Sequence, residues 1–426
     1  MKLLYLVLDG VADRPQDGPT SLELAHKPML DELAQKAKGG IMYTIGRGVA
    51  PESDSAVLSI LGYDPDRYYT GRGPLEALGV GIRIKEGYEV AFRANFATIN
   101  SSTGEIIDRR CGRDLKSEET KELAKTLNEI DLGISGAYVK VIPTIGHRAV
   151  VIIGHEWERL SGNVSNTDPA YIKRGNISVA VKDYKKVIAR CTPLDNTPEA
   201  KRTAEIVNIF TKKAIEVLDR HPVNLRRAKE GKLKANVILL RDSGDRLPRV
   251  KSLKERYGLS FGAIVEMPVE KGIARLLEMN VAELNPPTGN RKQDYEERVK
   301  ATLELLRRND CVYVHLKGPD EPGHDGNREK KVKAIEDIDR YYVALLLREI
   351  DLSEIVILVT ADHATPYTVR AHTDDPVPVI VASDALKPDG LTSFNERECA
   401  KGSLGTIEHG WLLLPKVLEL IGLGSA

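Results

Sequence analysis

The stretch Ile355-Val356-Ile357-Leu358-Val359-Thr360-Ala361-Asp362-His363 decides the fold of this chain. Its apolar first part is typical of a buried strand, and an Asp and a His follow side by side where that strand ends. Open α/β sheets carry their chemistry at the carboxyl ends of their strands. We therefore expect 355–360 to be a strand of a mostly parallel sheet, with Asp362 and His363 at its functional edge.

Other Asp and His residues stand in comparable places. Asp9 follows the apolar run 3–8, Asp320 and His324 lie four residues apart, and His372 comes nine residues after His363. Carboxylate and imidazole groups suit Zn²⁺ or Mn²⁺, and no Cys stands among them. A lone Asp-His pair would most simply be a helix cap beside a buried His. Together, however, these residues predict a pair of divalent ions, which in phosphoryl transfer lie about 3.5–4 Å apart.

Length, charge and cysteine content narrow the class of protein. At 426 residues the chain exceeds the usual size of one core, so two domains are expected. A formal net charge of zero argues against nucleic acid or a membrane surface as partner. No apolar run approaches the roughly 18–20 residues of a transmembrane helix. The start of the chain reads as a strand, and the four scattered Cys suit free thiols, so we expect a cytoplasmic protein. The sequence does not predict the number of subunits.

Short apolar runs alternate with amphipathic segments, as in βαβ units. Strands are predicted over Leu3–Leu8, Ala235–Leu240, Ala263–Met267, Cys311–Leu316 and Ile355–Thr360. Helices are predicted over Met29–Ala37, Glu199–Leu218, Lys271–Met279, Asp294–Arg307 and Lys330–Glu349.

The pattern changes in the middle of the chain. Shorter alternating runs, joined by turn residues and Arg-rich loops, predict antiparallel strands over Val90–Thr98, Ala137–Ile142 and Ala149–Ile153. We therefore predict a discontinuous core of residues 1–72 and 196–426, interrupted by an inserted α+β domain of residues 73–195. Motion between the two is expected, with hinges near 69–73 and 193–198.

Ser53 stands in a small-residue turn before the apolar helical stretch 56–60. Ser is a common helix N-cap, and for an isolated Ser that is the simplest interpretation. The functional interpretation makes Ser53 a nucleophile, activated by a metal ion and favoured by the positive end of the helix dipole.

Several motifs together resemble the alkaline-phosphatase superfamily: Leu8-Asp9-Gly10, Ser53-Asp54-Ser55-Ala56, Asp320-x-x-x-His324, Ala361-Asp362-His363 and His372-x-x-Asp375-Pro376-Val377-Pro378. Within it, the chain resembles the archaeal-type 2,3-bisphosphoglycerate-independent phosphoglycerate mutases through 62–65, 71–79, 108–113 and 146–150. The likeness runs over nearly the whole chain. It implies an alkaline-phosphatase-like α/β core, with a mostly parallel sheet and helices on both faces, plus an inserted α+β domain.

The resemblance also implies roles for residues of the core. One ion would be held by Asp9, Ser53, Asp362 and His363, and the other by Asp320, His324 and His372. Ser53 would be transiently phosphorylated, with Ser55 as the alternative. Lys251 would face the metals, with Lys254 as the alternative. His315 and His409 have no partner spacing and are interpreted as structural.

In the inserted domain the resemblance assigns substrate binding to Arg109, Arg110, Arg113, His147 and Arg148. Arginines in a polar loop are most often solvated, but Arg can hold a carboxylate or a phosphate through two hydrogen bonds. Asp108 would be the acid/base on the substrate hydroxyl, with Asp114 as the alternative. The segment 166–169 is most simply a turn.

The implied activity is the interconversion of 3-phosphoglycerate and 2-phosphoglycerate through a phosphoserine, a step of glycolysis and gluconeogenesis. Phosphoglycerate is then the expected small-molecule partner. The alternatives are a metal-dependent phosphatase or phosphodiesterase, or another phosphomutase of the superfamily. Mn²⁺ is the first choice for the two ions, and Zn²⁺, Co²⁺ and Mg²⁺ are alternatives that Asp/His sites also accept.

Overall fold

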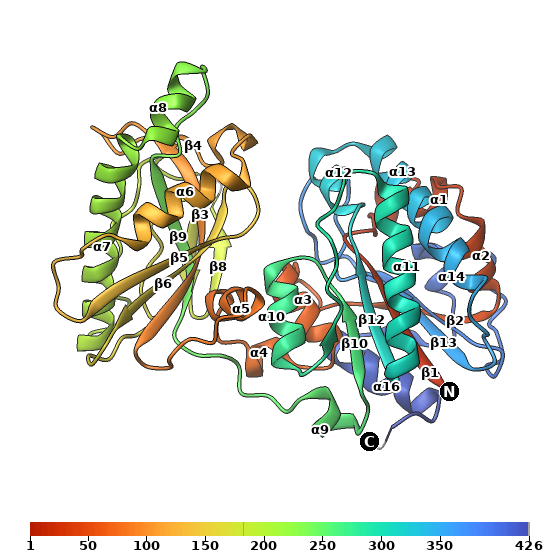
Figure 1. The fold of residues 1–426 in the computed structure, drawn as a ribbon. Coiled ribbons are helices and arrows are strands. Elements are labelled where there is room, and N and C mark those ends of the chain that lie inside the picture. The colour runs from red at the N-terminus through yellow and green to blue at the C-terminus, as the bar shows by residue number, and fades with distance from the viewer. Residues whose placement is uncertain (182, 425–426) are drawn as a thin grey trace. The chain divides into compact units, whose positions relative to one another are not determined.

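The structure is a computed structural model that describes residues 1–181 and 183–424. It divides into two compact units, and Figure 1 shows the elements of each. Unit 1 contains Met1–Tyr68, Val250–Glu266 and Ile273–Ala426, and unit 2 contains Tyr69–Arg249 and Met267–Gly272.

Unit 1 is built on an eight-stranded sheet in the order β11-β10-β12-β1-β13-β14-β2-β15. Its strands are β1 (Lys2–Leu8), β2 (Ala37–Met42), β10 (Phe261–Ile264), β11 (Asn280–Val281), β12 (Cys311–Leu316), β13 (Ile355–Thr360), β14 (Val377–Ala382) and β15 (Gly405–Ile407). All pairs from β11 to β13 are parallel, whereas β14 is antiparallel to both of its neighbours. The predicted mostly parallel α/β sheet is confirmed.

Three neighbouring strands set the position of the candidate site. Strand β1 pairs with β12 on one side and β13 on the other, so that Val7 lies level with both His315 and Thr360. Every residue of β12 is buried, as is usual for an inner strand of a parallel sheet. Because the three strands are parallel, the residues that follow them leave the sheet at the same edge.

Helices of unit 1 fill the connections between these strands. They are α1 (Ser21–Leu24), α2 (Pro28–Gln35), α3 (Ser53–Ile60), α4 (Pro65–Tyr68), α9 (Leu253–Tyr257), α11 (Arg291–Arg308), α12 (Asp320–Asp325), α13 (Arg328–Ile338), α14 (Ala344–Leu347), α15 (Glu396–Cys399) and α16 (Leu413–Leu420). Helix α11 packs on β10 and β12 (Figure 1), and α2 packs on β2 and β14. The predicted helix 330–349 is α13 and α14, joined by a π-helical turn at Asp339–Val343.

Unit 2 has an antiparallel sheet in which β3 pairs with β4, β6 and β9, and β5 pairs with β6. Its strands are β3 (Glu89–Ile99), β4 (Ile106–Asp108), β5 (Ala137–Pro143), β6 (Arg148–His155) and β9 (Val237–Gly244), and β7 (Tyr171–Arg174) with β8 (Ile177–Ala180) forms a hairpin. Its helices are α5 (Arg72–Gly79), α6 (Ser117–Asn128), α7 (Pro198–Asp219) and α8 (Pro222–Lys229). Helix α10 (Pro268–Leu276) begins in this unit and ends in unit 1.

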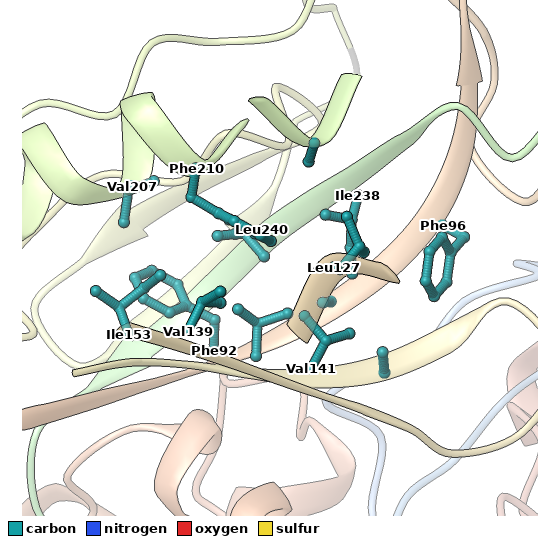
Figure 2. Packing of buried hydrophobic residues seen from close by; sticks show 14 of the residues in the cluster. Phe92, Phe96, Leu127, Val139, Val141, Ile153, Val207, Phe210, Ile238 and Leu240 are labelled. Carbon is teal, nitrogen blue, oxygen red and sulfur yellow. The ribbon is translucent and has the colours of Figure 1, made fainter. Parts of the chain in front are cut away.

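The core of unit 2 lies between its sheet and two helices. Figure 2 shows Phe92 and Phe96 of β3 packed with side chains of β5, α6 and α7, among them Phe210. The apolar positions of α6 and α7 recur every three or four residues, so each helix turns one apolar face to the sheet.

Unit 2 extends further along the chain than the predicted inserted domain, which ends at residue 195. Residues 196–249, expected in the core, belong to unit 2, because β9 pairs antiparallel with β3 from Ala97↔Val237 to Ala91↔Gly244 and α7 packs on β9. The apolar run in 235–240 correctly predicts a strand, but it carries no information on which sheet that strand joins. In the described part of the chain, no helix combines the length and apolarity needed to cross a bilayer.

A buried lysine joins two of the segments that leave the functional edge. Lys331 of α13 is fully buried and donates hydrogen bonds to the Ala12 carbonyl at 3.1 Å and the Thr365 carbonyl at 2.8 Å. Its ammonium group also forms an ion pair with Asp13 at 2.7 Å. The segment after β1, which carries Asp9, is thereby fixed to the segment after β13.

Lys331→Met should destabilise unit 1, because it leaves the Asp13 carboxylate buried without its ammonium partner. Removing one member of a buried ion pair typically costs about 3–5 kcal/mol, and we expect a loss of that size in the free energy of unfolding. Urea denaturation followed by circular dichroism measures it. The exposed neighbour Lys330 supplies the control, since Lys330→Met should stay within about 0.5 kcal/mol of the wild type. Equal stability of the two variants would contradict the expectation.

Candidate active site

The functional edge of unit 1 brings predicted ligands from the ends of β1 and β13 together. Asp9 follows β1 directly, and Asp362 and His363 follow β13. The Nε2 atom of His363 lies 3.2 Å from Asp362 Oδ2 and 3.5 Å from Asp9 Oδ1. All three residues are buried.

The other three predicted ligands form a second group around Asp320, the first residue of α12. His324 Nε2 and His372 Nε2 both lie 3.4 Å from Asp320 Oδ1. His324 reaches it because residues four apart share one face of a helix. The rings of His363 and His372 stack at 3.6 Å, so the two groups form one cluster.

Each predicted His ligand is anchored through its Nδ1 atom. His363 Nδ1 lies 2.9 Å from Thr365 Oγ1, His372 Nδ1 lies 2.8 Å from the Pro51 carbonyl, and His324 Nδ1 lies 3.4 Å from the Arg370 carbonyl. Metal-binding histidines are commonly oriented through the nitrogen that does not bind the ion. The arrangement leaves the three Nε2 atoms facing carboxylate oxygens.

The cluster fits divalent cations. Asp362 Oδ2, His363 Nε2 and His372 Nε2 are buried and lack a hydrogen-bond partner among the described residues, although buried polar atoms are nearly always paired. Burial opposes ionisation of Asp9, but Lys317 and the imidazoles of His315 and His363 outweigh it and hold the pKa of Asp9 well below its usual value. Ionised carboxylates beside imidazole nitrogens form a donor set suited to Zn²⁺, Co²⁺ or Mn²⁺.

The sequence does not assign a role in the site to two further residues of this cluster. His315, interpreted from the sequence as structural, is fully buried, and its Nε2 lies 3.2 Å from Asp362 Oδ2 and 3.7 Å from Asp9 Oδ1. Lys317 Nζ lies 3.1 Å from Asp9 Oδ2. The available signal was the position of both residues at the end of the run 311–316, which pairs with β1. By contrast, His409 stacks on Trp411 and binds the Ile45 carbonyl through Nδ1.

Ser53 is the first residue of α3, and Glu52 occupies the N-cap, so the interpretation of Ser53 as the cap is wrong by one residue. The turn before α3 is bound to the cluster, because Pro51 accepts the hydrogen bond from His372. The alternative nucleophile, Ser55, donates its hydroxyl to the Glu52 carbonyl at 3.1 Å.

Lys251, the lysine that the resemblance assigns to the metal site, precedes α9. It is exposed, and its carbonyl accepts a hydrogen bond from the Tyr63 hydroxyl at 2.7 Å. A second lysine, Lys317, contacts Asp9. It lines a cavity of about 300 Å³ together with Asp9, Asp320, Arg291 and Arg298.

In unit 2 the predicted substrate residues belong to a larger basic cluster. It consists of Arg93, Arg109, Arg110, Arg113, His147, Arg148 and Arg241. Arg109 is held by the buried carboxylate of Asp168, which accepts hydrogen bonds from its Nε and Nη2 atoms. The segment 166–169, interpreted as a turn, therefore also orients a predicted substrate residue. Tyr171 lies under two guanidinium groups, with its ring centroid 5.2 Å from Arg109 Cζ and 3.8 Å from Arg241 Cζ. Arg241 was not singled out from the sequence.

The charges of the basic cluster act on one another. Burial, followed by the positive charges of Arg148, Arg110 and Arg113, lowers the pKa of His147 to about 4. Burial and the neighbouring Arg72 and Arg241 lower the pKa of Arg93 to about 9. A set of positive groups that disfavour one another's charge is stabilised by an anion.

The two candidates for the acid/base have different environments. Asp108 Oδ1 accepts hydrogen bonds from the backbone N–H groups of Arg110 at 2.7 Å and Gly112 at 3.2 Å, which fixes the loop that carries the arginines. Asp114 forms an ion pair with the buried Arg227, which also binds Glu119 at 3.0 Å. Asp114 is therefore engaged in holding α6 and α8.

Comparison with known proteins places this geometry in a family. Residues 34–224 match the family model described as 2,3-bisphosphoglycerate-independent phosphoglycerate mutase. A protein of that name from Aeropyrum pernix is 47% identical over 425 residues, covering 99% of this chain and 100% of the relative. Another from Archaeoglobus fulgidus is 44% identical over 429 residues, covering 100% of this chain and 99% of the relative.

Two solved structures are similar in fold over nearly the whole chain. A protein from Pyrococcus horikoshii has a TM-score of 0.80 at 32% identity, covering 100% of this chain and 98% of the other. A cofactor-independent phosphoglycerate mutase from Thermoplasma acidophilum has a TM-score of 0.64 at 32% identity, covering 99% and 100%. The full-length identity to the curated relatives shows that this chain belongs to the 2,3-bisphosphoglycerate-independent phosphoglycerate mutase family.

Proposed function

We propose that this chain is an isomerase that interconverts 3-phosphoglycerate and 2-phosphoglycerate without added bisphosphoglycerate. Ser53 would accept the phosphoryl group from one hydroxyl of the substrate and return it to the other. The relatives that cover the full chain carry the name of this activity. The observation that carries the proposal is the cluster of Asp and His groups at the functional edge, bound through Pro51 to the turn that precedes Ser53.

Unit 1 would hold the two ions, one with Asp9, Ser53, Asp362 and His363 and the other with Asp320, His324 and His372. When bound, such ions lower the pKa of a serine hydroxyl and neutralise the charge of a transferring phosphoryl group. The chain itself fixes the donors, because the Nδ1 anchors orient the imidazoles and Lys331 joins the segments after β1 and β13. Ser53 lies at the positive end of α3, which favours a dianionic phosphoserine.

Unit 2 would bind the anionic groups of the substrate. The fork of Arg109, oriented by Asp168, can hold a carboxylate or a phosphate through two hydrogen bonds. Arg110, Arg113, His147 and Arg148 would add further contacts, and Asp108 would exchange a proton with the substrate hydroxyl. A mutase must keep the glycerate bound while the phosphoryl group resides on Ser53, and such a basic cluster meets that need.

The products separate this proposal from the alternative, a metal-dependent phosphatase. With 3-phosphoglycerate and Mn²⁺ or Co²⁺, and with no added bisphosphoglycerate, we expect 2-phosphoglycerate to form much faster than free phosphate. A coupled enolase assay and a phosphate assay on the same samples measure the two rates. Phosphate release that matches or exceeds isomerisation would favour the phosphatase.

Ser53→Ala should abolish turnover, because no other residue would receive the phosphoryl group. Loss of a covalent nucleophile typically lowers kcat by several orders of magnitude, and we expect at least about a thousandfold. Ser55→Ala is the matched control, since its hydroxyl binds the Glu52 carbonyl, and it should retain kcat within about threefold. Full mutase turnover by the Ser53→Ala protein would exclude Ser53 as the nucleophile.

Arg110→Ala should weaken substrate binding without changing the metal content. A hydrogen bond to a charged group contributes about 1.5–3 kcal/mol, so we expect KM to rise roughly 10- to 150-fold. Elemental analysis of the dialysed protein should give the wild-type number of ions. Arg226→Ala, at an exposed position of α8, is the control and should leave KM unchanged. An Arg110→Ala protein that lost its metal would show that Arg110 has a different role.

A further inference from the structure

We propose that His315 is a further protein ligand of the ion held by Asp9 and Asp362. The inference rests on the two-ion site of the proposed function and adds to it a residue that the family resemblance did not assign. It follows from the geometry of His315 alone, whose Nε2 atom approaches the same two carboxylates as that of the predicted ligand His363.

The two imidazoles stand in equivalent positions toward the carboxylates. His315 Nε2 and His363 Nε2 each lie 3.2 Å from Asp362 Oδ2, and they lie 3.7 and 3.5 Å from Asp9 Oδ1. Ligand atoms of Asp9, His315 and Asp362 all lie within 4.8 Å of one another. An ion placed among them is within reach of His315 as readily as of His363.

The remaining nitrogen of His315 is anchored as in the predicted ligands. Its Nδ1 atom lies 3.2 Å from the hydroxyl of Tyr313, two residues earlier on the same face of β12. Tyr313 in turn packs edge-on against Tyr5 of β1, with ring centroids 5.4 Å apart. The ring is therefore oriented so that Nε2, and not Nδ1, faces the carboxylates.

A purely structural role explains this placement less well. A buried imidazole has two ring nitrogens that each need a partner, and Tyr313 provides one only for Nδ1. His315 is fully buried, yet its second nitrogen faces two carboxyl groups, both of which are predicted ligands. The parallel register places it at the carboxyl end of β12, level with Val7, two residues before Asp9.

This ligand would also influence the choice of ion. Imidazole suits Zn²⁺ and other late transition metals, whereas carboxylate and water suit Mg²⁺ and Mn²⁺. A site with His315 and His363 beside two carboxylates is richer in nitrogen than one with His363 alone. We therefore expect His315 to favour Co²⁺ or Zn²⁺ over Mn²⁺.

Metal binding to the full chain tests the assignment directly. Apo-protein is titrated with Co²⁺ and with Mn²⁺ by equilibrium dialysis and metal analysis, and the visible absorption of bound Co²⁺ is recorded. Outer-shell residues typically contribute about 10- to 100-fold to metal affinity. His315→Gln should therefore weaken one of the two Co²⁺ ions by at least about 100-fold, change the Co²⁺ spectrum and reduce the preference for Co²⁺ over Mn²⁺.

Two further variants calibrate the result. Tyr313→Phe removes only the anchor of Nδ1 and should weaken the same ion by about tenfold with the spectrum retained. His409→Gln changes a His that lies outside the cluster, against Trp411, and should alter neither affinity nor spectrum. A His315→Gln protein that binds both ions with wild-type affinity and spectrum would overturn the proposal.

A crystal of the cobalt-loaded wild-type protein keeps the test decisive if His315→Gln does not fold. We expect an anomalous peak about 2.0–2.2 Å from His315 Nε2, and cobalt bound at more than about 3 Å from that atom would overturn the assignment. Mutase activity is measured separately. A protein that binds cobalt at His315 but does not isomerise phosphoglycerate would refute the proposed function alone, and a mutase with no cobalt at His315 would refute only this inference.

Discussion

The parallel pairing of β1 with β12 and β13 is the constraint on which the candidate site depends. It brings residues that are more than three hundred positions apart in the sequence to one edge, where Asp9 lies close to His315 and Asp362. A shift of one residue in either register would turn the alternate side chains to the opposite face of the sheet. Strand β12 is buried along its whole length and β13 at every residue but Ile355, and this burial stabilises the register that the site requires.

The carboxylates of Asp9, Asp320 and Asp362 repel one another, which opposes folding. The surrounding contacts offset this repulsion. Lys317 lies against Asp9, Thr365 donates its hydroxyl to Asp320 at 2.6 Å, and the backbone N–H of Gly10 donates to Asp362 at 3.0 Å. Each interaction stabilises the ionised form of one carboxylate without occupying all of its oxygens. Gly10 has φ of +61°, and a Cβ there would lie 2.7 Å from Asp320 Oδ1, so Gly is required at that turn.

The sequence predicts the strand ends well because their signals are local. An apolar run followed by an acidic residue identifies Asp9 and Asp362 without knowledge of the partner strands. His315 carries a weaker signal: it lies near the end of the run 311–316, and its position beside Asp9 follows only from the pairing of β12 with β1 across a long separation. The same limit explains residues 196–249, where the apolar run predicts β9 but not that β9 joins β3. For the same reason the sequence does not identify Arg93 and Arg241 as members of the basic cluster, because they lie within strands and not in the Arg-rich loop.

Zero net charge conceals a strong separation of charge that the proposed reaction needs. Unit 1 gathers carboxylates and imidazoles at one edge, whereas unit 2 gathers arginines, and burial together with their positive charges lowers the pKa of His147 and Arg93. Carboxylates alone would repel phosphoglycerate, so the acidic cluster becomes compatible with such a substrate only when cations are bound. Arginines alone would bind the anion without activating a hydroxyl. A phosphoryl transfer that retains the dephosphorylated product requires both the cation-binding acidic cluster and the basic cluster. The fold provides the first in unit 1 and the second in unit 2.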